Sequence, residues 1–169
     1  MKFCHECGNS LQGQTNFCSS CGAETSPPQA PQPTETRPME QTELRQFQFR
    51  KIGEYQLSGE EVDRKVEEGI AVSERLPLVY AITTDQVVAY LGQTMQGYRR
   101  PLGYHVNEKM ENVREGIREA LLKGQTVEVF ARSNELTMER EGLELNLREA
   151  MEKALTKKYM PEWNRAVDD

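Results

Sequence analysis

The chain has 169 residues, which is room for one ordinary domain and a small additional module. It is 37% hydrophobic and 28% charged, and it has neither a membrane-spanning apolar stretch nor the apolar core of a signal peptide, so we expect a cytoplasmic protein without membrane contact. The formal net charge is −6 and no segment is basic, which argues against a general electrostatic attraction to nucleic acid.

All four cysteines lie within the first 21 residues, in two Cys-x2-Cys pairs separated by ten residues: Cys4, Cys7, Cys18 and Cys21. Two residues between thiols let both sulfurs of a pair face one ion, and two pairs complete the tetrahedral four-thiolate shell of a structural zinc site. A glycine follows each pair and suits a tight turn with positive φ. We therefore predict one structural zinc ion, with iron in the same shell and a redox dithiol as alternatives.

The cysteine pairs have an aromatic and aliphatic context of their own. Phe3 and Phe17 each precede the first cysteine of a pair, and Leu11 lies in the spacer between the pairs. With their trailing glycines, these residues resemble the short bacterial zinc ribbons, and the resemblance covers residues 1–23. It implies a small β-rich module around the metal. It does not select a partner, because such ribbons bind either nucleic acid or protein.

Residues 24–43 form a proline-rich segment that contains five of the eight prolines. Ala30 and Met39 are its only hydrophobic residues, so it cannot bury a core and should sample extended, polyproline-like conformations. We predict a flexible linker between the cysteine module and a larger domain over 44–169.

The first elements of the larger domain are predicted as a strand and a helix. Loose alternation of apolar and polar residues predicts a strand over 44–52. Ser58 and Glu61 form a capping box, and the following valines and Ile70 recur at fourfold spacing, which predicts a helix from residue 58 to residue 70.

The next elements are a hairpin and a second helix. Runs of β-branched and aromatic residues at 78–83 and 86–91 predict two strands joined at Thr84 and Asp85. An apolar stripe then predicts a helix over 107–123, ended by Gly124.

The last elements repeat this order. Alternation predicts a strand over 126–131, with residues 135–139 pairing against it, and a final helix from about residue 142 that stops at Pro161. The order of elements predicts an α+β domain with a mostly antiparallel sheet and about three helices.

One loop combines cations with aromatic residues and glycines. It spans residues 92–105, and its candidate contacts with an anionic ligand are Tyr98, Arg99, Arg100, Tyr104 and His105. Arginines beside aromatic rings can hold phosphates and stack bases, and glycines let a loop follow a ligand. The alternative is that these arginines simply pair with neighbouring glutamates.

The remainder of the sequence carries no recognisable catalytic motif, and we attribute its many glutamates to solvated helix faces. We therefore interpret the protein as a zinc-binding cytoplasmic adaptor whose partner is another protein, and the sequence leaves open whether it is an enzyme. A nucleic-acid-associated protein that uses the ribbon or the 98–105 loop is the first alternative, and the acidic charge disfavours it. A small-ligand or enzymatic domain with an accessory ribbon is the second.

Overall fold

The computed structural model describes residues 2–3, 6–7, 9–11, 18, 20–21, 37–134, 136–140 and 143–164. The chain divides into two compact units, Met1–Glu35 and Thr36–Asp169. In the first unit, β1 (Lys2–Phe3) pairs antiparallel with β2 (Ser10–Leu11). The predicted linker lies outside the described residues up to residue 36, and residues 37–43 belong to the second unit, where Met39 is buried.

The second unit is built on a five-stranded sheet in which every neighbouring pair is antiparallel, in the order β4-β3-β7-β5-β6. Its strands are β3 (Arg50–Ser58), β4 (Glu61–Val66), β5 (Leu78–Thr84), β6 (Val87–Thr94) and β7 (Val127–Arg132). The interior strand β5, between β7 and β6, is an almost continuous apolar run, as expected for a strand buried on both faces.

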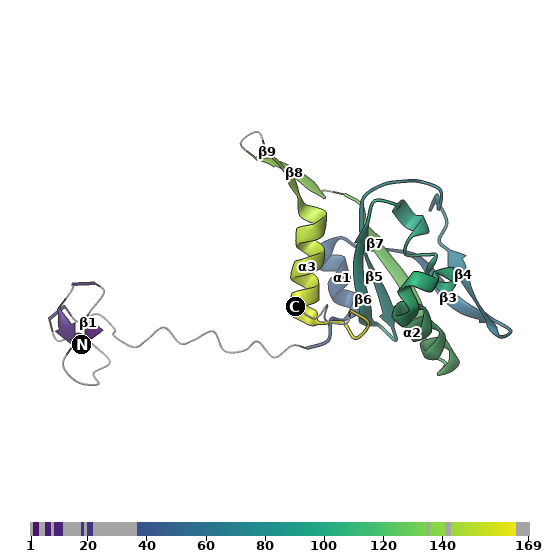
Figure 1. Ribbon diagram of the computed structural model, residues 1–169, viewed down its shortest axis with the longest axis horizontal. Helices are drawn as coiled ribbons and strands as arrows, with labels where there is room; N and C mark the ends of the chain where they lie inside the picture. The colour runs from purple at the N-terminus through teal and green to yellow at the C-terminus, as the bar shows by residue number, and fades with distance from the viewer. Residues whose placement is uncertain are drawn as a thin grey trace. The chain divides into compact units, whose positions relative to one another are not determined.

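Helices cover both faces of this sheet (Figure 1). On one face lies α2 (Glu111–Leu122), which packs on Tyr80 and Ile82 of β5. On the other face lie α1 (Gln41–Leu44) and α3 (Leu147–Tyr159), which pack on the alternate residues of the same strand. Because side chains alternate across a strand, β5 contributes to two separate cores.

Several predictions are confirmed. The α+β class, the mostly antiparallel sheet and the three α-helices hold for the residues that the structure describes. The hairpin of β5 and β6 forms as expected, with its turn at Asp85 and Gln86, both of which have positive φ. The helix predicted over 107–123 is α2, preceded by one 3-10 turn at Glu108–Met110, and the final helix is α3.

The helix predicted over 58–70 is wrong, because this segment is strand β4, paired with β3 across a tight turn. Val62 and Val66 fit both readings, since residues four apart share a helix face and also share a strand face. Gly59 decides between them: its φ of +67° belongs to a turn rather than to a helix.

Two further element predictions are corrected. Residues 44–52 begin as the end of α1 and the 3-10 turn Arg45–Phe47, and the strand starts only at Arg50. The strand expected at 135–139 does not pair with β7: β8 (Thr137–Arg140) pairs with β9 (Leu143–Asn146) in a separate hairpin. Within the described residues, no helix is both long and apolar enough to cross a membrane.

Candidate functional site

The loop between β6 and α2 is fixed at its start by Gly97, which packs against the segment that connects β4 and β5. This residue has a φ of +67°, and a Cβ atom placed there would lie 1.8 Å from the carbonyl oxygen of Glu74. Its backbone N–H donates a hydrogen bond to the carbonyl of Leu76 at 3.1 Å. Only glycine fits this backbone conformation and this close approach.

Buried tyrosines hold the rest of the loop. The Tyr55 hydroxyl donates to the carbonyl of Pro101 at 2.6 Å and accepts from the backbone N–H of Tyr104 at 3.2 Å. Arg50 donates to the Tyr98 hydroxyl at 2.7 Å. Tyr98 and Tyr104, predicted as ligand contacts, are 3% and 0% exposed, so both rings belong to the core beneath the loop.

Three tyrosines from different elements meet under the loop: Tyr80 of β5, Tyr90 of β6 and Tyr104. Their ring centroids lie 5.7 to 6.2 Å apart, and the hydroxyls of Tyr80 and Tyr104 are hydrogen-bonded at 2.5 Å. Gly92 makes room for this cluster, since a Cβ atom there would lie 2.6 Å from the Tyr80 ring. Burial raises the pKa of all three phenols, so they are protonated and can donate hydrogen bonds at neutral pH.

Arg100 connects the tyrosine cluster to the surface. Its guanidinium carbon lies 5.3 Å from the centroid of the Tyr104 ring, a cation–π distance. The side chain is half-buried, and it lines an open pocket of about 780 Å³. Arg100 therefore has the tyrosine cluster on one side and the pocket on the other.

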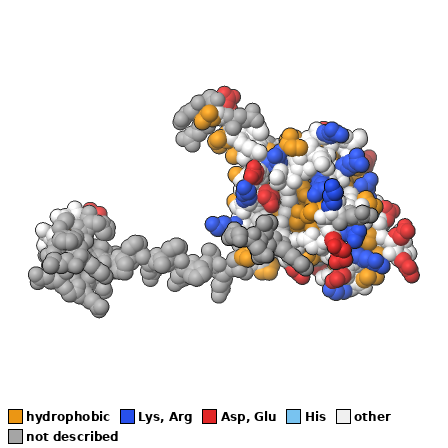
Figure 2. All heavy atoms as spheres, viewed as in Figure 1, with side chains coloured by type: hydrophobic (Ala, Val, Ile, Leu, Met, Phe, Trp, Pro, Cys, Tyr) orange, Lys and Arg blue, Asp and Glu red, His pale blue; other side chains and the backbone are white. Residues whose placement is uncertain are grey.

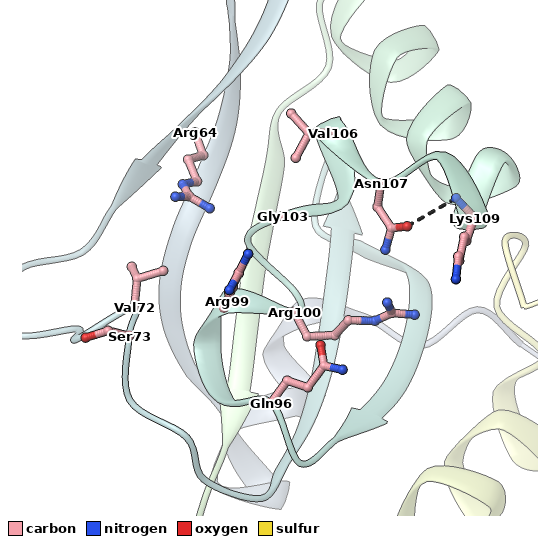
Figure 3. A pocket seen from close by; sticks show the side chains of 10 residues that line it. All are labelled: Arg64, Val72, Ser73, Gln96, Arg99, Arg100, Gly103, Val106, Asn107 and Lys109. Atoms are coloured by element: carbon pink, nitrogen blue, oxygen red, sulfur yellow. Dashed lines mark hydrogen bonds between the residues drawn. The ribbon is translucent and has the colours of Figure 1, made fainter.

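Among the side chains that the structure describes, four cations and no acidic group line the pocket (Figure 3). The cations come from β4 and from the loop: Arg64, Arg99, Arg100 and Lys109. Arg64 is held in place because its guanidinium donates to the carbonyl of Leu102 at 2.9 Å. Figure 2 shows several Lys and Arg side chains gathered beside an apolar patch in the middle of the larger unit.

The structure does not support the alternative prediction that the loop arginines pair with neighbouring glutamates. Among the residues that the structure describes, none of the four pocket cations forms an ion pair. Four uncompensated positive charges around one pocket create a potential that attracts an anion. The formal charge of the whole chain does not show this local excess.

His105, the last predicted contact of the loop, does not line the pocket. Its ring packs edge-on against Tyr55, with centroids 5.7 Å apart. Burial and the nearby Arg64 guanidinium lower the pKa of His105, so the imidazole is neutral at neutral pH. Of the five predicted residues, Arg99 and Arg100 line the pocket and the other three support it.

Glu152 on α3 is a functional candidate that the sequence did not reveal. It is half-buried, and its burial raises the pKa of the carboxyl group. Its neighbour Lys153 is paired instead with Glu149, at 2.7 Å. A partly buried carboxylate without a paired cation is costly, which is typical of a group that binds a ligand or a metal ion. In the sequence, this residue is one of many helix glutamates.

The helix that carries Glu152 packs against β6, the strand of Tyr90. One turn before Glu152, the half-buried Arg148 places its guanidinium against the sulfur of Met95. Met95 immediately precedes Gln96, which lines the pocket. This end of α3 therefore contacts the residue next to the pocket lining, although α3 packs on the face of the sheet opposite to α2.

In the first unit, three thiols come together: the sulfur atoms of Cys7, Cys18 and Cys21 all lie within 4.8 Å of one another. Hydrogen bonds from the backbone N–H groups of Ser20 and Cys21 lower the pKa of the Cys18 thiol to about 6, which favours the metal-binding thiolate. The fourth predicted ligand, Cys4, lies outside the described residues, as does His5.

Comparisons with known proteins identify the fold of the larger unit. No protein-family model and no curated protein matches the chain. A solved structure of a glutamate-to-alanine variant of bacteriophage T4 EndoII is similar, with 22% identity, a TM-score of 0.56, and coverage of 75% of this chain and 99% of that chain. The restriction endonuclease HPY188I in complex with product DNA matches with 11% identity and a TM-score of 0.43, over 78% of this chain and 88% of that chain.

These comparisons correct the functional interpretation drawn from the sequence. The adaptor function and the protein partner are wrong, because the larger unit has the fold of T4 EndoII, which is an endonuclease by its name. The description as a zinc ribbon for protein interaction finds no support among the matches. The acidic total charge of the chain gave no sign of the four cations that are concentrated around one pocket.

Proposed function

We propose that residues 37–164 form an endonuclease domain that cleaves the phosphodiester backbone of nucleic acid in the cationic pocket. One observation carries the proposal: four cations without ion pairs surround the pocket, and one of them, Arg100, rests on a buried tyrosine cluster. The fold shared with T4 EndoII supports it.

The cations supply the first requirement, which is to hold the phosphate. Arginine binds phosphate oxygens through two parallel N–H donors, and such charge-assisted hydrogen bonds are about twice as strong as neutral ones. Arg100 is oriented for this role because the Tyr104 ring fixes its guanidinium. In the transition state, negative charge grows on the non-bridging oxygens, and a fixed arginine stabilises it.

The tyrosines supply the second requirement, which is to orient the reacting oxygens. Hydrolysis needs a positioned water molecule and a proton for the departing oxygen. The phenols of Tyr80 and Tyr104 are protonated and share one hydrogen bond, so one of the two O–H groups remains to donate to an oxygen beside Arg100. Of the three rings in the cluster, Tyr90 is the least buried.

Glu152 fits the third requirement, which is a ligand for a divalent cation. Mg²⁺ in phosphoryl-transfer sites is commonly held by one or two carboxylates together with substrate phosphates. Glu152 is a half-buried carboxylate that forms no ion pair with any cation among the described residues, so its donor chemistry fits such an ion. When bound, Mg²⁺ would supply further neutralisation of charge on the phosphate.

A plasmid-cleavage assay tests the proposal. The purified chain is incubated with supercoiled plasmid in Mg²⁺, and nicked and linear products are measured on a gel. Arg100→Ala should reduce the cleavage rate by about 100-fold, the usual effect of losing one transition-state donor. The matched control is Arg118→Ala, because Arg118 is exposed on α2 and does not line the pocket.

Cleavage of nucleic acid by the wild-type protein decides whether it is an endonuclease. Absence of cleavage of plasmid, single-stranded DNA and RNA alike would contradict an endonuclease function. If Arg100→Ala and Arg118→Ala reduce the cleavage rate equally, the pocket is not part of the mechanism. Of these two arginines, only Arg100 contacts the tyrosine cluster.

For the first unit, we propose that Cys4, Cys7, Cys18 and Cys21 hold one structural zinc ion. Two sulfurs bound to one tetrahedral zinc ion, each at about 2.3 Å, lie about 3.8 Å apart. The sulfurs of Cys7 and Cys18 are separated by 3.7 Å, which supports this geometry. Four thiolates close the shell and leave no position for a catalytic water, so the metal would stabilise the unit rather than take part in cleavage.

A further inference from the structure

The pocket is larger than a phosphate requires. Its volume of about 780 Å³ falls in the range of about 300–1,000 Å³ in which small-molecule sites enclose a whole ligand. The four cations account for phosphate binding, yet two side-chain amides also line the pocket, those of Gln96 and Asn107. Amides contribute little to holding a phosphate charge, and they are among the side chains that read base edges.

The Asn107 amide has a defined orientation. Its Oδ1 accepts a hydrogen bond from the backbone N–H of Lys109 at 3.1 Å, which caps the 3-10 turn before α2. One lone pair of the oxygen is therefore engaged, and both Nδ2–H donors remain for a ligand. Asn107 offers donors to the pocket.

Gln96 stands at the opposite end of the loop. Its backbone N–H donates to the Thr94 hydroxyl at 2.9 Å, which holds the residue in place. Within the described part of the chain, its side-chain amide has no hydrogen-bond partner. In the view of Figure 3, Arg100 lies between Gln96 and Asn107, so a group bound to Arg100 would have an amide on either side.

The polar groups around the pocket are mostly donors. The four cations can only donate, and the Asn107 amide keeps two free donors and one free acceptor position. The other acceptors come from Gln96 and Ser73. Among the bases, guanine presents two adjacent acceptors, O6 and N7, whereas cytosine presents a donor and adenine presents one of each. We propose that this pocket selects guanine next to the phosphate that it holds, with Gln96 and Asn107 as the specificity-determining residues.

This inference rests on the proposed endonuclease function, and a sequence-resolved cleavage assay tests it. Duplex DNA with a randomised central region is cleaved to low conversion, and the product ends are sequenced. We expect guanine to be enriched by about fivefold or more at one position beside the cleaved bond, the lower limit for a specific base contact. Cleavage without guanine enrichment would overturn the inference and leave the endonuclease function standing.

Two variants and a control assign the preference to the amides. Gln96→Ala removes one amide, and Asn107→Ser removes the other while keeping a hydroxyl that can cap the turn. Both should reduce the guanine enrichment. Gln93→Ala, an exposed glutamine on β6 outside the pocket, should leave it unchanged. An enrichment that persists in both pocket variants would remove these residues from base recognition.

A change in the substrate gives the same test without altering the protein. Replacing the enriched guanine by 7-deazaguanine removes the N7 acceptor and keeps the base pair. Cleavage of this duplex should fall by about fivefold or more relative to the guanine duplex. Equal rates on the two duplexes would overturn the inference. If the wild-type chain cleaves neither duplex, and also leaves plasmid, single-stranded DNA and RNA intact, the endonuclease proposal itself fails.

Discussion

The side-chain amide of Asn164 forms two hydrogen bonds with the backbone of Leu91, although the residues are 73 positions apart in the sequence. Its oxygen accepts from the Leu91 N–H and its nitrogen donates to the Leu91 carbonyl, both at 2.6 Å. The amide thus pairs with β6 as the backbone of a further strand would. Leu91 lies between Tyr90 and Gly92, so this contact fixes the strand segment that supports the tyrosine cluster.

Asn164→Ala should therefore lower both stability and cleavage. It leaves a donor and an acceptor of Leu91 without partners, which costs about 1–3 kcal/mol in the free energy of unfolding. Urea denaturation measures this loss, and plasmid cleavage measures the effect on the site. Glu162→Ala is the control because Glu162 is exposed in the same segment. Equal stability of the two variants would show that the Leu91 contact is unimportant.

Gly97→Ala should destabilise the protein more than Gly59→Ala. Both glycines have a φ of +67°, so both substitutions introduce the same backbone strain. A Cβ atom at residue 59 has nothing within 4 Å, whereas one at residue 97 would clash with the Glu74 carbonyl oxygen. Gly59→Ala should cost about 1 kcal/mol of unfolding free energy, and Gly97→Ala more than twice as much. Equal costs in thermal or urea denaturation would contradict the close approach at Gly97.

Glu152→Gln should stabilise the protein at neutral pH and lower its activity. The folded-state pKa of Glu152 is raised, so the folded protein binds more protons than the unfolded chain as the pH rises from the unfolded pKa to the folded pKa. Wild-type stability therefore falls across this window, which lies above about pH 4. The glutamine variant lacks the ionisation and should not show this loss. Denaturation at pH 4 and pH 7, together with plasmid cleavage, measures both effects.

Glu149→Gln is the control, because it should change the stability at neutral pH in the opposite direction to Glu152→Gln. Its hydrogen bond with Lys153 lowers the pKa of Glu149, so its contribution to stability is present at neutral pH and disappears as the pH falls. The glutamine variant at 149 should thus be slightly less stable than wild type at pH 7, with normal cleavage. If Glu152→Gln is also less stable than the wild type at pH 7, the ionised carboxylate of Glu152 does not destabilise the folded protein.

Lys51→Met should destabilise the larger unit in a pH-dependent way. The Lys51 ammonium lies 2.7 Å from Glu54, 3.5 Å from Glu67 and 2.6 Å from Glu128. Without it, these carboxylates repel one another, at a cost of about 1–2 kcal/mol for a partly exposed network. The loss should shrink near pH 4, where carboxylates become protonated. A loss of the same size at both pH values would point to packing rather than charge.

Zinc removal should affect only the proposed metal site. Native mass spectrometry should show one zinc per chain, absent after chelation and absent in Cys18→Ser. Cleavage by residues 37–164 should persist in the Cys18→Ser variant, since the tyrosine cluster and the pocket lie outside the first unit. A chain without metal and with a mass deficit from disulfides would contradict the zinc proposal.

Local patterns in the sequence predicted much of the framework. The β5–β6 hairpin, α2, β7 and α3 follow from periodicity and capping residues, because each depends mainly on neighbours along the chain. The strand β4 was misread since its valines satisfy two periods at once. The site was reached only in part: Arg99 and Arg100 stood out as cations in a glycine-rich loop.

The rest of the site depends on contacts between distant residues. Nothing local indicates that Tyr80 and Tyr90, in two predicted strands, would meet Tyr104 from the loop, or that Tyr55 would bond to Pro101. Glu152 was indistinguishable from other helix glutamates, because its unusual feature is partial burial, which appears only after α3 packs on β6.

The contact between Asn164 and Leu91 also sets an order of events during synthesis. Translation runs from the N-terminus, so β5, β6 and the loop leave the ribosome long before the segment that completes the edge of β6. A nascent chain that ends before Pro161 contains every tyrosine of the cluster but lacks this last support. If the proposed endonuclease function holds, such a chain would cleave less efficiently than one that extends to Asn164, because it lacks the contact that supports the tyrosine cluster.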